Sequence, residues 1–279
     1  MNKADFLKKL EIELKIAKNS ENTKKNYLRL NTQLIDYTKK DPGEISTDDV
    51  KVFIAENLSD KASSSIVMFL SAIKYAYLGI LKKDITSDIK RPKRERVVPD
   101  VLTKKEIFSL LEALTNKKSR IMISLIYATG LKVSEVTNLK IDDLDFDDKI
   151  GKILDKTGKV KRTFNIPKFL AAKLRHRAEK QKAQGEIYLF PGQNKKKMSD
   201  RNVQKIVKKA AIKAGIKIDV QTQTLRHSFA VHLLEKDIDI KKIKKLLGHS
   251  DLSTTQIYRK VSTEKLNKIK SPLDSMMNR

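Results

Sequence analysis

The chain has 279 residues and a formal net charge of +26, which arises from 60 Lys and Arg residues against 34 Asp and Glu residues. It contains no cysteine, which excludes disulfides, thiolate catalysis and zinc sites built from cysteine. Residues 1–99 carry 20 basic and 14 acidic side chains, whereas residues 100–279 carry 40 and 20. This asymmetry indicates a polyanionic partner, nucleic acid above all, although genome bias or thermophily can account for part of the lysine excess.

The length suits two domains of ordinary size. The two most apolar runs, 68–81 and 121–131, are shorter than the roughly 18 residues that a membrane-spanning helix needs. No basic segment followed by an apolar one opens the chain, as it would in a signal peptide. We therefore expect a soluble, cytoplasmic protein with no membrane segment.

Periodic apolar side chains predict a helical first domain over residues 1–87. Ser46 or Thr47 can cap the third of its helices, and the DPG sequence at 41–43 ends the second. The expected helices cover residues 3–18, 20–37, 46–58 and 63–82. Residues 88–100 follow as a basic linker with two prolines; such a segment is a solvated connector, and it also suits a clamp that closes around a DNA duplex.

A mostly helical second domain is expected over residues 101–279. Thr103 and Glu106 form a capping-box pattern at its start, and the KTGKVK sequence lies between two weakly alternating segments, which predicts a β-hairpin. The strands are expected at 150–154, 162–166 and 187–190. The helices are expected from residue 103 and then at 119–128, 131–140, 167–184, 200–215, 224–236, 239–247 and 253–259.

An acidic cluster precedes the hairpin, at Asp143, Asp145, Asp147 and Asp148. It does not fit a calcium-binding loop, because the sixth position is Asp148 where glycine is required and the twelfth is Leu154 where glutamate is required. The cluster instead predicts a solvated turn before a strand.

Three short segments near the C-terminal end contain candidate functional residues: LRHSFA, LGHS and STTQIY. Tyr258, at the end of the third, is the candidate nucleophile. His249 follows a glycine that should close one helix, Ser253 can cap the next, and Arg226 lies near the start of an amphipathic helix. A lone Tyr or His is usually structural, but the joint order and spacing of the three segments are highly specific.

Together these segments resemble the active-site half of the tyrosine recombinases, the integrase family of DNA strand-exchange enzymes. The chain is similar to the Xer-type members, archaeal ones included, that resolve chromosome dimers. YATGLKVSEVTNL resembles the family's first active-site box and KTGK its β-hairpin lysine. The resemblance implies a helical, SAM-like core-binding domain over 1–87, the linker 88–100, and a mainly helical catalytic domain with a small antiparallel sheet over 101–279.

The implied reaction is transesterification of DNA. Tyr258 would attack a phosphodiester and expel the 5′-hydroxyl, leaving a 3′-phosphotyrosyl bond that a 5′-hydroxyl of the partner duplex then attacks. By the resemblance neither ATP nor a metal is required, so no cofactor is expected. The partners would be double-stranded DNA recombination sites.

The resemblance also implies a role for each site residue. Arg226 would clamp two phosphate oxygens, and His249 would donate a hydrogen bond or exchange a proton. Lys156 would be the general acid toward the 5′-oxygen, although it can equally be an ordinary hairpin lysine and Lys159 lies close by. The two histidines of the LRHSFAVH segment, His227 and His232, are expected to be structural.

Two positions depart from the family pattern. Lys132 stands where the family has arginine, and Gln223 stands where it usually has histidine. Lys132 keeps the charge but loses the bidentate fork, and Gln223 can donate a hydrogen bond but cannot relay a proton. We expect an active enzyme with these two residues in the site. The alternatives are a DNA-binding or architectural protein without catalysis, a nicking-closing enzyme, and a mobile-element integrase.

The resemblance implies a homo-tetramer on DNA, in which the tail from Ser262 docks on a neighbouring subunit. Folding of the tail back onto its own domain is a nearly equal alternative. No segment of the sequence indicates an accessory protein. The apolar anchors of the tail would be Leu266, Ile269, Leu273 and Met276.

Overall fold

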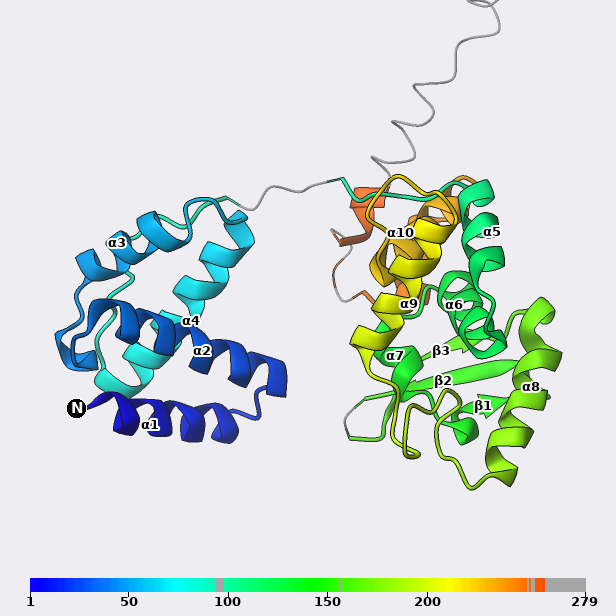
Figure 1. Ribbon diagram of the computed structural model, residues 1–279, viewed down its shortest axis with the longest axis horizontal. Coiled ribbons are helices and arrows are strands. Elements are labelled where there is room, and N and C mark those ends of the chain that lie inside the picture. Colours follow the sequence, from blue (N-terminus) through cyan, green and yellow to red (C-terminus); the bar gives the residue numbers. More distant parts are fainter. Residues whose placement is uncertain (94–97, 156, 250, 252–253, 259–279) are drawn as a thin grey trace, which may run out of the picture. The chain divides into compact units, whose positions relative to one another are not determined.

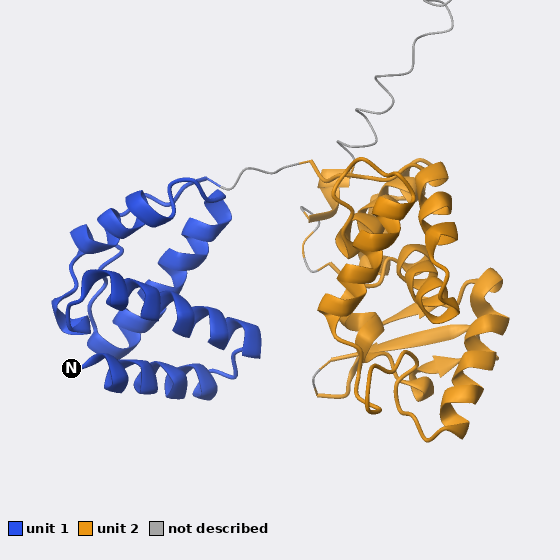
Figure 2. Cartoon of the chain, viewed as in Figure 1, with its two compact units in different colours: residues 1–96 blue, residues 97–279 orange. Residues whose placement is uncertain are grey.

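The computed structural model describes residues 1–93, 98–155, 157–249, 251 and 254–258. The chain divides into two compact units, Met1–Arg96 and Val97–Arg279 (Figure 2). The described part contains many helices and one small antiparallel sheet (Figure 1), so the expected mainly helical class is confirmed.

The first unit is a bundle of amphipathic helices around one apolar core. Its elements are α1 (Lys3–Ile16), α2 (Glu21–Thr38), the 3₁₀ turn η1 (Pro42–Glu44), α3 (Thr47–Asn57) and α4 (Ser63–Leu81). The fully buried residues Phe6, Leu34, Phe69 and Tyr77 come from three of these helices. Buried apolar side chains recur at the 3.6-residue spacing of a helix, so each helix turns one face toward the core.

Local capping explains where α3 begins. Ser46 Oγ accepts a hydrogen bond from the Asp49 backbone N–H at 3.2 Å, and the Asp49 carboxylate accepts one from the Ser46 backbone N–H at 2.9 Å. This reciprocal pair satisfies two N–H groups that have no partner within the helix. Ser46 rather than Thr47 is thus the cap.

Helix α4 is long and apolar enough to cross a membrane by length and composition alone, with a mean hydropathy of 1.6. The apolar run 68–81 is itself shorter, and the helix reaches this length because it also includes Ser63 and the residues up to Val67. Its inward face is packed in the core of the first unit, as in the central helix of a helical bundle. The buried residues of α4 are Phe69, Leu70, Ala72, Ile73, Ala76 and Tyr77.

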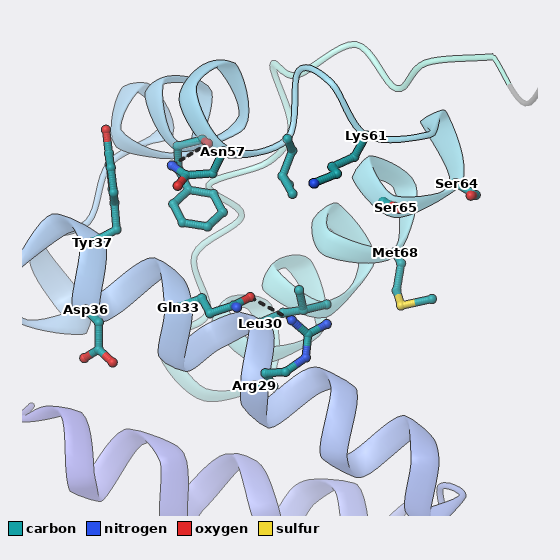
Figure 3. A pocket seen from close by; sticks show the side chains of 12 residues that line it. Arg29, Leu30, Gln33, Asp36, Tyr37, Asn57, Lys61, Ser64, Ser65 and Met68 are labelled. Atoms are coloured by element: carbon teal, nitrogen blue, oxygen red, sulfur yellow. Dashed lines mark hydrogen bonds between the residues drawn. The ribbon is translucent and has the colours of Figure 1, made fainter. Parts of the chain in front are cut away.

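A pocket of about 570 Å³ opens between α2, α3 and α4 (Figure 3). Met68, Arg29 and Lys61 line it, and Arg29 donates a hydrogen bond to Gln33 at 3.0 Å. Its lining mixes apolar surface with single polar groups and contains neither histidine nor a carboxylate pair. The candidate catalytic residues belong to the other unit.

The second unit carries the sheet and most of the helices. Its strands are β1 (Leu144–Asp145), β2 (Ile150–Leu154) and β3 (Val160–Asn165), paired antiparallel in the order β1-β2-β3. Its helices are α5 (Lys104–Ala113), α6 (Lys117–Thr129), α7 (Val133–Asn138), the 3₁₀ turn η2 (Ile141–Asp143), α8 (Lys168–Ala183), α9 (Asp200–Lys213), α10 (Thr222–Leu234) and α11 (Ile240–Leu247). Residues 254–258 are also helical.

The third strand is not where the sequence predicted it. Residues 187–190 make a single bridge, Lys140 to Tyr188, and the third strand of the sheet is β1. The partner segment turns into η2 directly after this bridge, so the ladder cannot continue although Leu189 and Phe190 are buried. An apolar run of this length predicts burial better than it predicts strand pairing.

Two residues of the acidic cluster, Asp147 and Asp148, lie in the turn between β1 and β2, whereas Asp143 ends η2 and Asp145 ends β1. One carboxylate oxygen of Asp145 accepts hydrogen bonds from the backbone N–H groups of Asp147 and Asp148, at 3.1 and 2.9 Å. These bonds hold the pKa of Asp145 below its usual value, the bond from Asp148 contributing most. The predicted turn before a strand is confirmed.

Candidate active site

Two glycines end the helices that frame the site. Gly130 closes α6 with φ 63°, and Gly248 closes α11 with φ 65°. A Cβ at Gly130 would lie 2.5 Å from a ring carbon of Phe229, and one at Gly248 would lie 2.6 Å from Cδ of Arg162. Only glycine combines this left-handed backbone with such close neighbours, so both helix ends can approach the centre of the unit.

Arg226 connects these two helix ends from the first turns of α10. Its guanidinium donates one hydrogen bond to the Gly130 carbonyl and one to the Leu247 carbonyl, each at 2.5 Å. The side chain is 1% exposed, and its Nε is buried without a hydrogen-bond partner among the described residues. Burial lowers the pKa of Arg226 from its usual value, but an arginine stays protonated. The site thus contains a buried, fixed cation.

Glu135 stands between two arginines and the backbone of Lys132. Its Oε2 accepts hydrogen bonds from Nη2 of Arg162 at 2.6 Å and from the Lys132 backbone N–H at 2.8 Å, and it lies 3.9 Å from Nη1 of Arg226. Arg162 also donates to the Leu246 carbonyl at 2.6 Å. One carboxylate therefore compensates a cluster of cations and joins β3, α7 and α10.

Lys132 is the N-terminal flanking residue of α7, and its side chain is exposed. Partial burial, followed by the charge of Arg226, lowers its pKa, while Glu135 opposes the shift. The lysine therefore lies within the electrostatic reach of the other site residues. Gln223 is exposed in the first turn of α10, three residues before Arg226.

Tyr258 is 1% exposed and lies against two histidines. Its Oη is 2.9 Å from Nδ1 of His227, and the two ring centroids are 5.4 Å apart. The ring of His249 is stacked with the Tyr258 ring, with a centroid distance of 6.4 Å and an interplanar angle of 26°. His249 Nδ1 is itself 2.9 Å from Oγ1 of Thr255.

The pKa values of these three groups are shifted in one direction, toward the neutral forms. Burial, and then the cation of Arg226, lowers the pKa of His227 to about 4, and burial lowers that of His249 to about 4 as well. Burial raises the pKa of Tyr258, and Arg226 opposes this. At neutral pH the site therefore holds two neutral imidazoles and a protonated phenol beside a fixed cation.

The structure brings together most, but not all, of the expected site residues. Tyr258, Arg226 and His249 converge, whereas Lys156 and the proposed cap Ser253 lie outside the described residues, as does the tail from Ser262. The nearby Lys159 is exposed, and its backbone N–H donates to Asp155 at 3.1 Å.

His227 was expected to be structural, and the structure places its Nδ1 2.9 Å from the hydroxyl of Tyr258. His232 fits the structural role, because its Nδ1 lies 2.9 Å from the hydroxyl of Tyr127. Glu135 and Arg162 were missed altogether. The three-residue spacing of Glu135 from Lys132 was a local signal of a capping contact, whereas nothing near Arg162 in the sequence marked it.

Comparison with known proteins now adds the family. Residues 100–265 match the phage integrase family, and residues 6–87 match the N-terminal SAM-like domain of phage integrases. The chain belongs to the phage integrase family. It is a tyrosine recombinase, as expected, and enzymes of this family cut and rejoin DNA strands.

Two relatives illustrate how much of this tyrosine recombinase is shared. The tyrosine recombinase XerA of Thermococcus kodakarensis is 39% identical over 214 residues, which cover 75% of this chain and 74% of that protein. The tyrosine recombinase XerD of Oceanobacillus iheyensis is 32% identical and covers 94% of each chain. Among solved structures, a lambda integrase tetramer bound to a Holliday junction has a TM-score of 0.76 at 19% identity, covering 97% of this chain and 80% of that chain. This last likeness shows the shared fold.

Proposed function

We propose that the chain is a site-specific DNA recombinase whose nucleophile is Tyr258. The observation that carries the assignment is the convergence of Tyr258, His249 and the buried Arg226 at the ends of α6 and α11. Nucleophilic attack on a phosphodiester requires a phenol, an imidazole and a fixed guanidinium of this kind. The enzyme would leave a 3′-phosphotyrosyl bond and later rejoin the strand.

The chemistry follows from where negative charge develops. As Tyr258 Oη bonds to phosphorus, charge accumulates on the non-bridging oxygens, and preorganised donors stabilise that charge. Arg226 has five N–H donors, of which two make the carbonyl bonds described above, so others remain for a phosphate oxygen. His249 would donate a further hydrogen bond. The bond from phosphorus to the 5′-oxygen then breaks, and Lys156 would supply the proton that the 5′-oxygen takes up.

Lys132 and Gln223 fit this scheme as weaker versions of the usual residues. Lys132 adds positive charge near Arg226 without bidentate geometry, and Gln223 can donate to a phosphate oxygen. Replacing the bidentate guanidinium of an arginine by the Lys132 ammonium would slow cleavage on the order of a hundredfold, by analogy with removal of one oxyanion donor. We expect turnover to survive this loss.

DNA must reach a nucleophile that is covered in the DNA-free chain. Because Tyr258 is 1% exposed, a phosphate cannot contact Oη until its surroundings shift. Val98, near the end of the basic linker, and Val101, directly after it, pack on the same apolar cluster as Tyr258. Binding of DNA by the domains on either side of the linker is therefore a natural trigger for opening.

The domain roles extend the same proposal. Residues 1–87 would be the core-binding domain, 88–100 the linker and 101–279 the catalytic domain with its tail. The basic face of α9 is a candidate DNA contact, with a solvated lysine-rich face as the plain alternative; its exposed cations are Arg201, Lys205, Lys208, Lys209 and Lys213. Affinity for DNA should fall steeply as salt rises, because phosphate contacts release counterions.

The biological role that we propose is resolution of chromosome dimers in the cytoplasm, by a homo-tetramer on double-stranded recombination sites. The relatives named XerA and XerD support it. One of the structural neighbours is a tetramer on a Holliday junction, which supports the assembly. The tail from Ser262 would dock on the adjacent subunit. A mobile-element integrase is the alternative role within the same chemistry.

The test is covalent trapping on nicked duplexes that carry candidate host sites, with wild type and Tyr258→Phe in parallel. We expect a denaturant-resistant protein–DNA adduct that is absent from the Tyr258→Phe reaction. DNA binding without an adduct on any site would favour the second candidate function, a non-catalytic DNA-binding protein, which Lys132 and Gln223 motivate. Rescue of the adduct by Lys132→Arg would then identify the lysine as the cause.

A further inference from the structure

The hydrogen bond between His227 and Tyr258 is a feature that the proposed roles leave unused. It joins α10 to the helical residues 254–258. The two bonded residues are 31 positions apart in the sequence. The same helix carries a second His–Tyr pair of equal length, His232 with Tyr127, outside the site. The first pair differs in one respect: its hydroxyl is the proposed nucleophile.

We propose that His227 is the general base that accepts the phenolic proton of Tyr258 during strand cleavage. This role rests on the function proposed above and deepens it. His227 would be a catalytic residue, because its Nδ1 lies 2.9 Å from the attacking atom. That distance is within the range that direct proton transfer requires.

The other groups around Tyr258 are less suited to this task. His249 pairs its Nδ1 with Thr255, and its ring is stacked face-on rather than aimed at the hydroxyl. Gln223, four residues before His227 on α10, cannot take a proton. Arg226, Arg162 and Lys132 are cations. Within the described part of the chain, His227 is the imidazole whose hydrogen bond goes to the nucleophile.

The proton balance of the step is complete. Neutral His227 carries its proton on Nε2 and accepts the Tyr258 hydrogen bond through Nδ1. As the Oη–P bond forms, the phenolic proton moves to Nδ1 and His227 becomes an imidazolium; the P–O5′ bond breaks and the 5′-oxygen takes a proton from the general acid. In the reverse attack by a 5′-hydroxyl, His227 returns its proton to the departing Tyr258 oxygen.

The electrostatic surroundings of His227 favour an imidazole that is unprotonated before DNA binds. His227 is faced by Arg226 on its own helix, by Tyr258, and by His249 after α11, which in turn lies near Lys132 and Arg162. The low pKa of about 4 keeps His227 unprotonated at neutral pH. A bound phosphodiester would offset the cation of Arg226 and so raise that pKa toward the operating pH, where a general base is most effective.

The experiment measures single-turnover cleavage between pH 6 and 9.5 on a nicked duplex that the wild type cleaves in the trapping assay. His227→Asn is the key variant, because its amide can keep a polar atom near the position of Nδ1 but cannot take up the proton. The control is His232→Asn, which disturbs the matched pair with Tyr127. Thermal unfolding and DNA binding of both variants would be measured alongside.

We expect a wild-type rate that changes little over this range. His227→Asn should be about a hundredfold slower at pH 7, within the usual contribution of a general base, and its rate should rise about tenfold per pH unit, because the phenol must then ionise first. His232→Asn should keep the flat wild-type profile, whatever it does to stability.

Two results would overturn this role while leaving the proposed function intact. One is a flat, wild-type-like profile for His227→Asn, and the other is faster cleavage by that variant at every pH, which would make the hydrogen bond a restraint on the nucleophile. Failure of the wild type to form an adduct on any site would instead remove the proposed function, and the role of His227 with it.

Discussion

Glu135 and Arg162 form a largely buried ion pair, with Oε2 and Nη2 2.6 Å apart and side chains 11% and 7% exposed. The pair joins α7 to β3, and Arg162 also donates a hydrogen bond to the Leu246 carbonyl in the last turn of α11. The helix end that precedes His249 is thereby tied to the strand and, through Glu135, to the backbone N–H of Lys132. The ion pair is thus part of the framework that aligns the site.

Removing the carboxylate should destabilise the fold. In Glu135→Gln, Arg162 would lose its charged partner and Arg226 its nearest negative charge, so we expect a loss of about 3 kcal/mol in the free energy of unfolding. Denaturant unfolding measures this. Asp147→Asn is the matched control, because it breaks an exposed pair with Arg175, 2.8 Å long, and should change stability little. Equal losses in the two variants would contradict the framework role of Glu135.

Gly248→Ala should damage the site more than its backbone strain alone explains. A Cβ there would lie 2.6 Å from Cδ and 3.0 Å from Nε of Arg162, and φ is 65°. We expect about 1 kcal/mol from the strained backbone, a further loss from displacement of Arg162, and slower cleavage because His249 follows directly. Gly215→Ala controls for strain, since it has φ 70° and open space around the new Cβ. Equal stability losses in both variants would show that displacement of the Arg162 side chain does not lower the free energy of unfolding.

Lys132→Arg should speed up strand cleavage and extend it to higher pH. The rate gain would be as large as about a hundredfold if the guanidinium binds the phosphate with both nitrogens. Partial burial and Arg226 lower the pKa of Lys132, so its charge is lost at a lower pH than that of an ordinary lysine. The wild-type rate should therefore be lower at pH 10, above the range in which it is expected to be flat, while the arginine variant keeps its rate. Single-turnover cleavage at pH 7 and pH 10 compares the two; a slower variant would mean that the site is shaped for lysine.

Acid should weaken the fold through the two site histidines. His227 and His249 bind a proton near pH 4 in the folded chain but near 6.5 when unfolded, so the unfolded state takes up more protons as the pH falls through this window. The melting temperature should thus drop between pH 7 and pH 5. His227→Asn and His249→Asn should each flatten that decline. An unchanged slope in both variants would show that these imidazoles titrate normally in the folded protein.

Much of the fold could be predicted because its signals are local. Helix α3 begins after Ser46 and α5 after Thr103. In both caps, side chains and backbone N–H groups three residues apart form reciprocal hydrogen bonds. Segment 187–190 was assigned wrongly, because burial of Leu189 and Phe190 is a property of the packed unit and not of strand pairing.

The sequence by itself determined the helical periodicity, the caps and the order of the active-site segments, and hence the identity of Tyr258, Arg226 and His249 as candidates. Only the tertiary structure decided that Arg162 reaches Glu135 and that the phenol of Tyr258 meets His227 rather than solvent. These pairs are 27 and 31 residues apart. Such contacts depend on how separate helices and a strand pack together. Residue spacing within a single helix or strand carries no information about which distant residues will come into contact.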